Sequence, residues 1–105
     1  MIAADQPVCF PSDLLIAVSS KDDGTMFNRI RGRHVAEIVN NRRRFCNQIG
    51  VKYDDVVYHV ISYDQTQTFD NIAEVTEADT VKHNNEGIFA DALYTEMAGV
   101  GLFLP

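Results

Sequence analysis

The sequence lacks any apolar run close to the roughly 20 residues that a membrane-spanning helix needs. Its first ten residues, MIAADQPVCF, have no basic segment followed by an apolar one, which is the pattern of a secretory signal. Cysteine is scarce, because Cys9 and Cys46 are the only two and can form at most one disulfide. Without an export signal we expect both to be free thiols. These features predict a cytoplasmic protein with no membrane partner.

Motifs of several common sites are missing as well. The sequence has no P-loop and no GxGxxG segment. Its histidines, His34, His59 and His83, lie far apart and form no HxH or HExxH spacing, and there is no CxxC pair. The residues alone therefore predict no local zinc site and no phosphate-binding glycine loop of a known type.

Composition and charge indicate one small folded domain. Of the 105 residues, 46% are hydrophobic and 23% are charged, as in an ordinary globular protein. The net charge is −6, yet residues 21–44 carry seven basic side chains against three acidic ones, whereas residues 45–105 carry ten acidic against two. An acidic chain with one basic segment does not suit general nucleic-acid binding. It suits a site for a small anion such as phosphate.

The first half of the chain predicts a strand, a turn and a helix. The apolar run at 14–18 predicts a core strand, and the polar residues at 20–25 predict a turn with a positive φ angle at Gly24. Helical spacing of apolar residues predicts an amphipathic helix from about Arg33 to Ile49, closed by Gly50. The predicted apolar face consists of Val35, Ile38, Val39, Phe45, Cys46 and Ile49. We expect Cys46 to be a small buried hydrophobe.

Arg42 falls within this apolar face, and the helix dipole favours the Arg42–Arg44 triplet in the last two turns. A charged side chain at such a position must extend its head to water or pair with an acid. We therefore expect Arg42 to do one of the two.

The second half predicts strands separated by turns. The run at 56–63 is apolar or aromatic at both alternating sets of positions, so we expect a central strand covered on both faces. Residues 72–76 predict a short strand that pairs with it as a hairpin, and residues 84–87 predict a surface turn beside an exposed His83. The apolar run at 100–104 predicts a strand buried on both faces. The expected fold class is α/β (α+β), a mixed sheet with one main helix.

Several segments also match a known family in order and spacing. Ser20-Lys21 and Gly24 follow the first strand as a Ser-Thr-Arg-x-Gly-Gly loop does, and Asn28 matches the asparagine of a Ser-Leu-Asn-Leu-Gly segment. The segment 41–45, NRRRF, matches Glu-Asn-Arg-x-Arg-Leu, and 90–95 reads ADALYT. In these segments the chain resembles the laccase-domain (YfiH-like) family, long described as polyphenol oxidases and now regarded as purine nucleoside phosphorylases.

The resemblance implies that residues 1–105 form a single, incomplete domain, the N-terminal part of the family fold. It implies phosphorolysis of adenosine- or inosine-type nucleosides in the complete protein, with purine nucleoside and phosphate as substrates. It also implies zinc, or copper in older descriptions, held by a His/Cys/His site. Lys21 takes the place of the family's active-site arginine, and Asn28 and His59 complete the catalytic residues that the resemblance implies. The cysteine and second histidine come later in the family, so we expect residues 1–105 alone to be inactive and to bind no metal.

Two alternatives stay open at this stage. The family's first metal ligand is the histidine of a Gln-Val-His-Gly motif, and one register places Ile61 at that position. A shift by two residues keeps the same face of the strand and places His59 there instead. The second alternative concerns function, because the chain also fits a degenerate, non-catalytic α/β domain. Such a domain would bind a partner, or a second copy of itself, through an exposed sheet edge.

Overall fold

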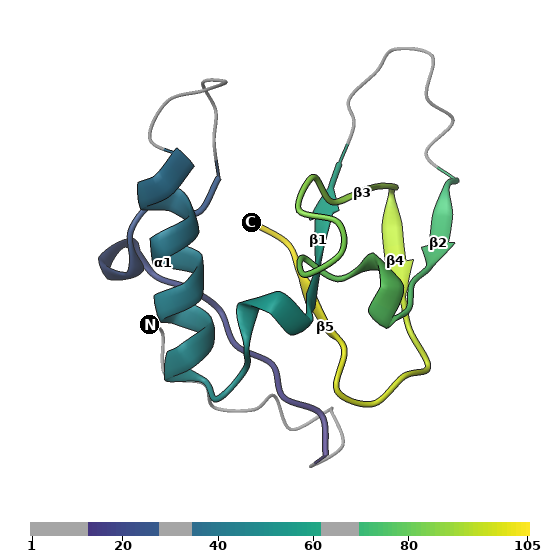
Figure 1. The fold of residues 1–105 in the computed structure, drawn as a ribbon, viewed down its shortest axis with the longest axis horizontal. Coiled ribbons are helices and arrows are strands. Elements are labelled where there is room, and N and C mark those ends of the chain that lie inside the picture. Colours follow the sequence, from purple (N-terminus) through teal and green to yellow (C-terminus); the bar gives the residue numbers. More distant parts are fainter. Residues whose placement is uncertain (1–12, 28–34, 62–69) are drawn as a thin grey trace. The chain divides into compact units, whose positions relative to one another are not determined.

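The computed structural model describes residues 13–27, 35–61 and 70–105. Within these ranges the chain is an α+β protein with one α-helix, three single-turn 3₁₀ helices and small β-sheets, drawn in Figure 1. It divides into two units, residues 1–50 with the α-helix and residues 51–105 with the strands. The elements are η1 (Lys21–Asp23), α1 (Val35–Gln48), η2 (Tyr53–Asp55), β1 (Val56–Val60), β2 (Ile72–Glu74), η3 (Glu77–Asp79), β3 (Ile88–Phe89), β4 (Ala92–Tyr94) and β5 (Gly101–Phe103).

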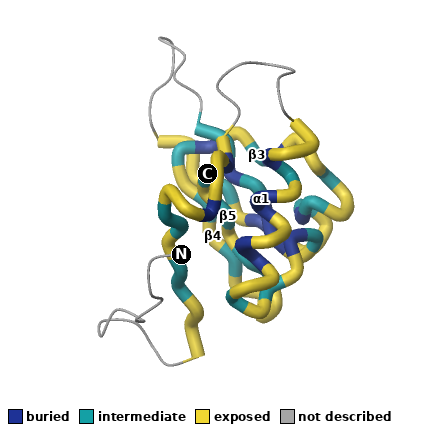
Figure 2. Tube along the Cα trace, turned by 90° about the vertical axis from the view of Figure 1, so that its left-hand side faces the viewer, coloured by how far each residue is buried: buried dark blue, intermediate teal, exposed yellow. Residues whose placement is uncertain are grey.

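The helix of the first unit matches its predicted position and end. α1 runs to Gln48, and Gly50 follows it with a φ angle of 78° while its N–H donates to the carbonyl of Asn47. Ile38, Phe45 and Cys46 are buried, as expected of the apolar face of an amphipathic helix. Val35, predicted on the same face, is exposed in the first turn. Figure 2 shows the buried positions along α1 in dark blue, separated by exposed ones.

The strand predicted at 14–18 is wrong, because residues 14–20 form no regular secondary structure. Leu15 and Val18 are more than half exposed, with 53% and 58% of their surface accessible. An apolar, β-branched run becomes a strand only when a neighbouring strand accepts its hydrogen bonds, and none of the strand pairs described includes this run. The turn after it is confirmed, since η1 is followed by Gly24 at a φ angle of 85°.

The second unit is built around β1, as the sequence predicts. In the order β3-β1-β5 it is the middle strand of a three-stranded sheet, and Val56, Val57 and His59 are buried. The β-branched residues of β1 suit a strand that is covered on both faces. Both neighbours run parallel to β1, and so does β2 to β4. The sheets described are therefore parallel, and the mixed sheet that we expected is not found among them.

The predicted hairpin between 56–63 and 72–76 is also wrong. β2 forms in the expected place, but it pairs in parallel with β4, with Ala73 opposite Leu93. β1 has no edge left for β2, because β3 and β5 already occupy its two sides. Residues 62 and 63 of the predicted strand lie outside the described residues.

The last strand forms where the sequence predicts it, after a turn at Gly99 with a φ angle of 81°. It is not buried on both faces, because Leu102 and Leu104 are 47% and 62% exposed. β5 is an outer strand of its sheet, so only alternate side chains point to the interior. On the inner side Phe103 packs edge-on against Tyr53, with ring centroids 5.9 Å apart.

Candidate functional site

The candidate site of the second unit lies where the parallel strands β1 and β3 end. His59 is the fourth of the five residues of β1, and Ala90 follows β3 directly. In sheets of parallel strands, ligands commonly bind beyond the carboxyl ends of the strands. The topology thus brings the predicted histidine to the first residue of the Ala90–Thr95 segment, 31 positions later in the chain.

His59 is 8% exposed, and its Nε2 lies 2.7 Å from the carbonyl oxygen of Ala90. A carbonyl oxygen only accepts hydrogen bonds, so Nε2 must carry the proton that is donated. In the neutral imidazole, Nδ1 then holds the lone pair. A lone pair at Nδ1 is what a base or a metal ligand offers.

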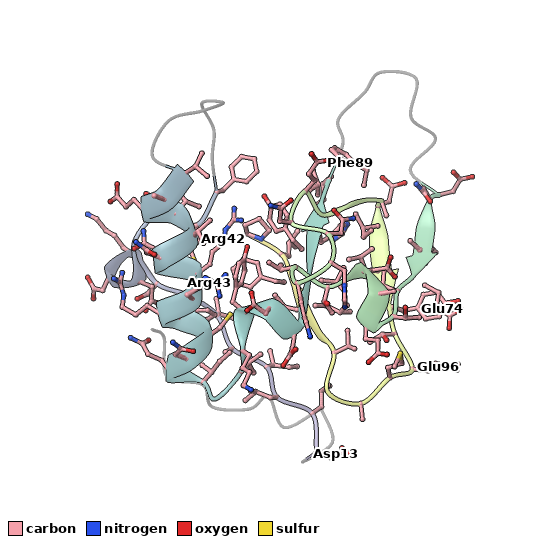
Figure 3. The ribbon with its side chains drawn as sticks, in the orientation of Figure 1. Asp13, Arg42, Arg43, Glu74, Phe89 and Glu96 are labelled. Atoms are coloured by element: carbon pink, nitrogen blue, oxygen red, sulfur yellow. The ribbon has the colours of Figure 1, made fainter. Side chains whose placement is uncertain are left out.

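Ala90 is itself fixed on both sides. It is buried, and its N–H donates to the carbonyl of Val60 at 3.2 Å. The next residue, Asp91, accepts a bond from the backbone N–H of Asn71 at its Oδ2, at 2.8 Å, and returns one from its own N–H to the Asn71 carbonyl, also at 2.8 Å. These two opposed bonds join the start of β2 to the peptide that follows Ala90. Phe89, labelled in Figure 3, precedes Ala90 and exposes its ring.

The first unit holds the loop with Lys21. Lys21 is exposed and opens η1, after Ser20. The backbone N–H of Ser20 donates to Oδ2 of Asp23 at 2.7 Å, and this bond holds the pKa of the Asp23 carboxyl below its usual range. The turn is thus closed by its own side chain and leaves an ammonium group on the surface.

Three side chains of α1 bind carbonyl groups of this loop. Nδ2 of Asn41 donates to Thr25 at 3.0 Å, Nε of Arg42 donates to Met26 at 2.8 Å, and Nη2 of Arg44 donates to Asp23 at 3.2 Å. Arg42 and its exposed neighbour Arg43 are labelled in Figure 3. The three bonds tie residues 23–26 to the helix.

One of the two alternatives predicted for Arg42 is wrong, because its side chain does not extend to water: the residue is 6% exposed. Its Nε donates to the backbone carbonyl of Met26, a partner that the sequence did not predict. A carbonyl satisfies a guanidinium N–H as a carboxylate does, without a second charge. Sequence patterns missed this contact because every residue of the loop carries a carbonyl.

The predicted site residues are divided between the two units. Lys21 belongs to the first unit and His59 to the second. Asn28 lies outside the described residues, as does His34. Ile61, the alternative ligand position, is half-buried just after β1, and His83 is exposed as predicted. Of these residues, His59 is the one that the structure joins to another segment of the family resemblance.

Metal-binding groups are not assembled in the described ranges. Among residues 13–27, 35–61 and 70–105, no three His, Cys, Asp or Glu side chains lie close enough to hold an ion. Cys46 is a free, buried thiol, as predicted, and burial raises its pKa. The described residues do not fit a zinc site on their own.

No helix in the described part of the chain has the length and apolar character of a membrane span. Comparison of the chain with models of protein families, with curated proteins and with solved structures finds no match.

Proposed function

We propose that the chain is the N-terminal part of a laccase-domain purine nucleoside phosphorylase. The observation that supports this proposal is the contact between Nε2 of His59 and the carbonyl of Ala90. It joins two segments that resemble the family independently and lie 31 residues apart. A shared ancestor explains why both segments occur in one chain and meet at the end of one parallel sheet.

The reaction proposed is phosphorolysis, in which the bond between ribose and purine breaks and phosphate forms the new bond to the sugar. In the complete enzyme Lys21 would face the phosphate, since an exposed ammonium on a closed turn attracts an anion. His59 would hold or accept a proton at Nδ1, because its Nε2 is engaged. The zinc of the family would need ligands from outside the described residues.

The experiment that tests this proposal is a phosphorolysis assay on the protein encoded by the full reading frame. Inosine or adenosine is supplied with phosphate, and free purine base and ribose 1-phosphate are measured. We expect base release that requires phosphate and yields equal amounts of the two products. No release, or release that is the same without phosphate, contradicts the proposal.

Lys21→Ala tests the anion-facing role separately. Loss of one charge-assisted hydrogen bond costs about 1.5–3 kcal/mol, which raises the KM for phosphate about 10- to 100-fold. Lys82→Ala is the matched control, because Lys82 is an exposed lysine of the second unit and should leave this KM unchanged. An equal change in the KM for phosphate in the two variants would contradict the role of Lys21 in phosphate binding.

A second candidate function is that of a non-catalytic interaction module. It is favoured by the exposure of Leu102 in the outer strand β5 and of Leu104 just after it, two apolar side chains at alternate positions that a partner could cover together. A second copy of the chain would cover them. Sedimentation at increasing concentration should then show dimers that Leu102→Ser with Leu104→Ser dissociates, and a monomer at every concentration would contradict this function.

A further inference from the structure

We propose that Asp91 is a positioning residue for His59, an inference that rests on the proposed function for the use made of the histidine. The bonds of Asp91 described above are those to the backbone of Asn71. Asp91 acts on the peptide that the imidazole binds.

The Ala90 carbonyl sets the orientation of the His59 ring. His59 is buried, and the bond from Nε2 to the Ala90 carbonyl is short, at 2.7 Å. The direction in which Nδ1 points therefore depends on where this carbonyl lies. A displacement of the Ala90 carbonyl would rotate the ring or break the bond.

The Ala90 carbonyl is fixed in turn by the hydrogen bonds of Asp91. The carbonyl carbon of Ala90 belongs to the same planar peptide as the N–H of Asp91. That N–H donates to the carbonyl of Asn71 at 2.8 Å, and the carboxylate of Asp91 accepts from the N–H of Asn71 at 2.8 Å. The peptide that carries the histidine's partner is thus bound at its other end to Asn71, the residue that precedes β2.

The two bonds between Asp91 and Asn71 differ in strength. Hydrogen bonds that involve an ionised group are roughly twice as strong as neutral ones. The bond to the Asp91 carboxylate is the charged member of the pair, so its removal should loosen the Asn71 contact more than loss of any other side chain there. The Nε2–H of His59 would then open to water more often.

The experiment measures this opening by NMR on the whole chain labelled with ¹⁵N-histidine, without substrate. The resonances of His59 are assigned with His59→Gln. In the native chain we expect Nε2 to carry the proton, Nδ1 to be bare, and the Nε2–H proton to exchange slowly with water. A native His59 whose proton resides on Nδ1 would overturn the proposal at once, whatever the variants do.

Asp91→Ala should accelerate the exchange of this proton by about 10- to 100-fold, the effect of losing one charged hydrogen bond. Asp91→Asn keeps an acceptor oxygen and should restore most of the slow exchange. Asp79→Ala is the matched control, because Asp79 also accepts a bond from a backbone N–H, that of Thr76 at 2.9 Å, in an exposed turn. It should change the exchange less than about twofold, because the backbone N–H that Asp79 binds belongs to Thr76 and not to Asn71 or the Ala90 peptide.

Equal exchange in Asp91→Ala and Asp79→Ala at matched stability would refute the positioning role. Should Asp91→Ala fail to fold, Asp91→Asn against the native chain decides, since its weaker acceptor should still raise the exchange measurably above the native rate. The measurement needs no catalysis. A faster exchange in a protein that shows no phosphorolysis would therefore keep Asp91 as a positioning residue and reject the proposed function alone.

Discussion

The structure predicts that Gly87 is the glycine of the second unit that tolerates a side chain least. Its φ angle is 88°, in the region that favours glycine, and a Cβ atom there would lie 2.6 Å from the backbone oxygen of Tyr58. It would also lie 2.6 Å from Cδ1 of the Tyr58 ring and 3.0 Å from Cγ2 of Val60. The ring can move, but the backbone oxygen belongs to the central strand and cannot. Gly87 therefore sets how closely the start of β3 approaches β1.

Gly99 is the matched control for Gly87→Ala. Its φ angle is 81°, almost the same, yet a Cβ atom there would meet nothing within 4 Å. Both alanine variants carry a backbone cost of about 1–3 kcal/mol for a non-glycine residue in this conformation. Only Gly87→Ala adds the cost of overpacking, which is about 1–3 kcal/mol. The difference between the two variants isolates the contact with Tyr58.

The assay is urea unfolding followed by circular dichroism. A chain of this size has a total stability of about 5–15 kcal/mol, so the extra cost is a measurable fraction of it. With a slope of about 1–3 kcal/mol per molar urea, we expect the midpoint of Gly87→Ala to fall at least about 0.3 M below that of Gly99→Ala. Equal midpoints for the two variants would show that the approach of β3 to β1 is not limited by this contact, and the reasoning would fail.

Three further predictions concern the first unit. Arg42→Ala should lower the free energy of unfolding by about 2–4 kcal/mol, because it removes the donor to the Met26 carbonyl and leaves a cavity. Arg43→Ala, at an exposed position, should cost less than about 1 kcal/mol, and similar urea midpoints for the two variants would contradict this prediction. Because the pKa of Asp23 is lowered in the folded chain, its contribution to stability is present above the unfolded pKa of 3.8 and is lost as pH falls through the lower folded pKa. Asp23→Asn should therefore reduce the loss of stability at acid pH, and an unchanged loss would refute this prediction. Cys46 is buried, and burial raises the pKa of its thiol. In Cys9→Ser, where Cys46 is the remaining thiol, we expect reaction with a disulfide reagent only after urea unfolds the chain, and fast reaction of the native chain would contradict the burial.

Short-range sequence patterns predicted the helix, the central strand and the turn. The helical spacing and Gly50 placed α1 to within a few residues, and the β-branched residues from Val56 onward identified the central strand. The turn at Gly24 followed from its neighbours in sequence. The helix and the turn depend on residues close together in the chain, and the central strand is recognised from the composition of a short window although its partners are distant.

Pairing between strands was not predicted, because it depends on residues far apart. The run at 14–18 has the composition of a strand, but composition does not supply a neighbour, and the run stays irregular. β2 was expected beside β1 only because it is the next strand in sequence. Its actual partner, β4, begins 20 residues after β2 begins, and a parallel arrangement requires such a crossover.

The same limit explains what sequence could and could not say about the polar residues of the candidate site. A buried arginine or histidine must find a hydrogen-bond partner. The positions of Arg42 in an apolar stripe and of His59 in a central strand therefore predict that each side chain makes a hydrogen bond. Both contacts are made to backbone carbonyls, of Met26 and Ala90, 16 and 31 residues away. Every residue has a carbonyl, so side-chain patterns carry no record of which one is used. Under the proposed function the bond at Nε2 matters most, because in the neutral imidazole it leaves the lone pair of His59 on Nδ1, and only the fold determines it.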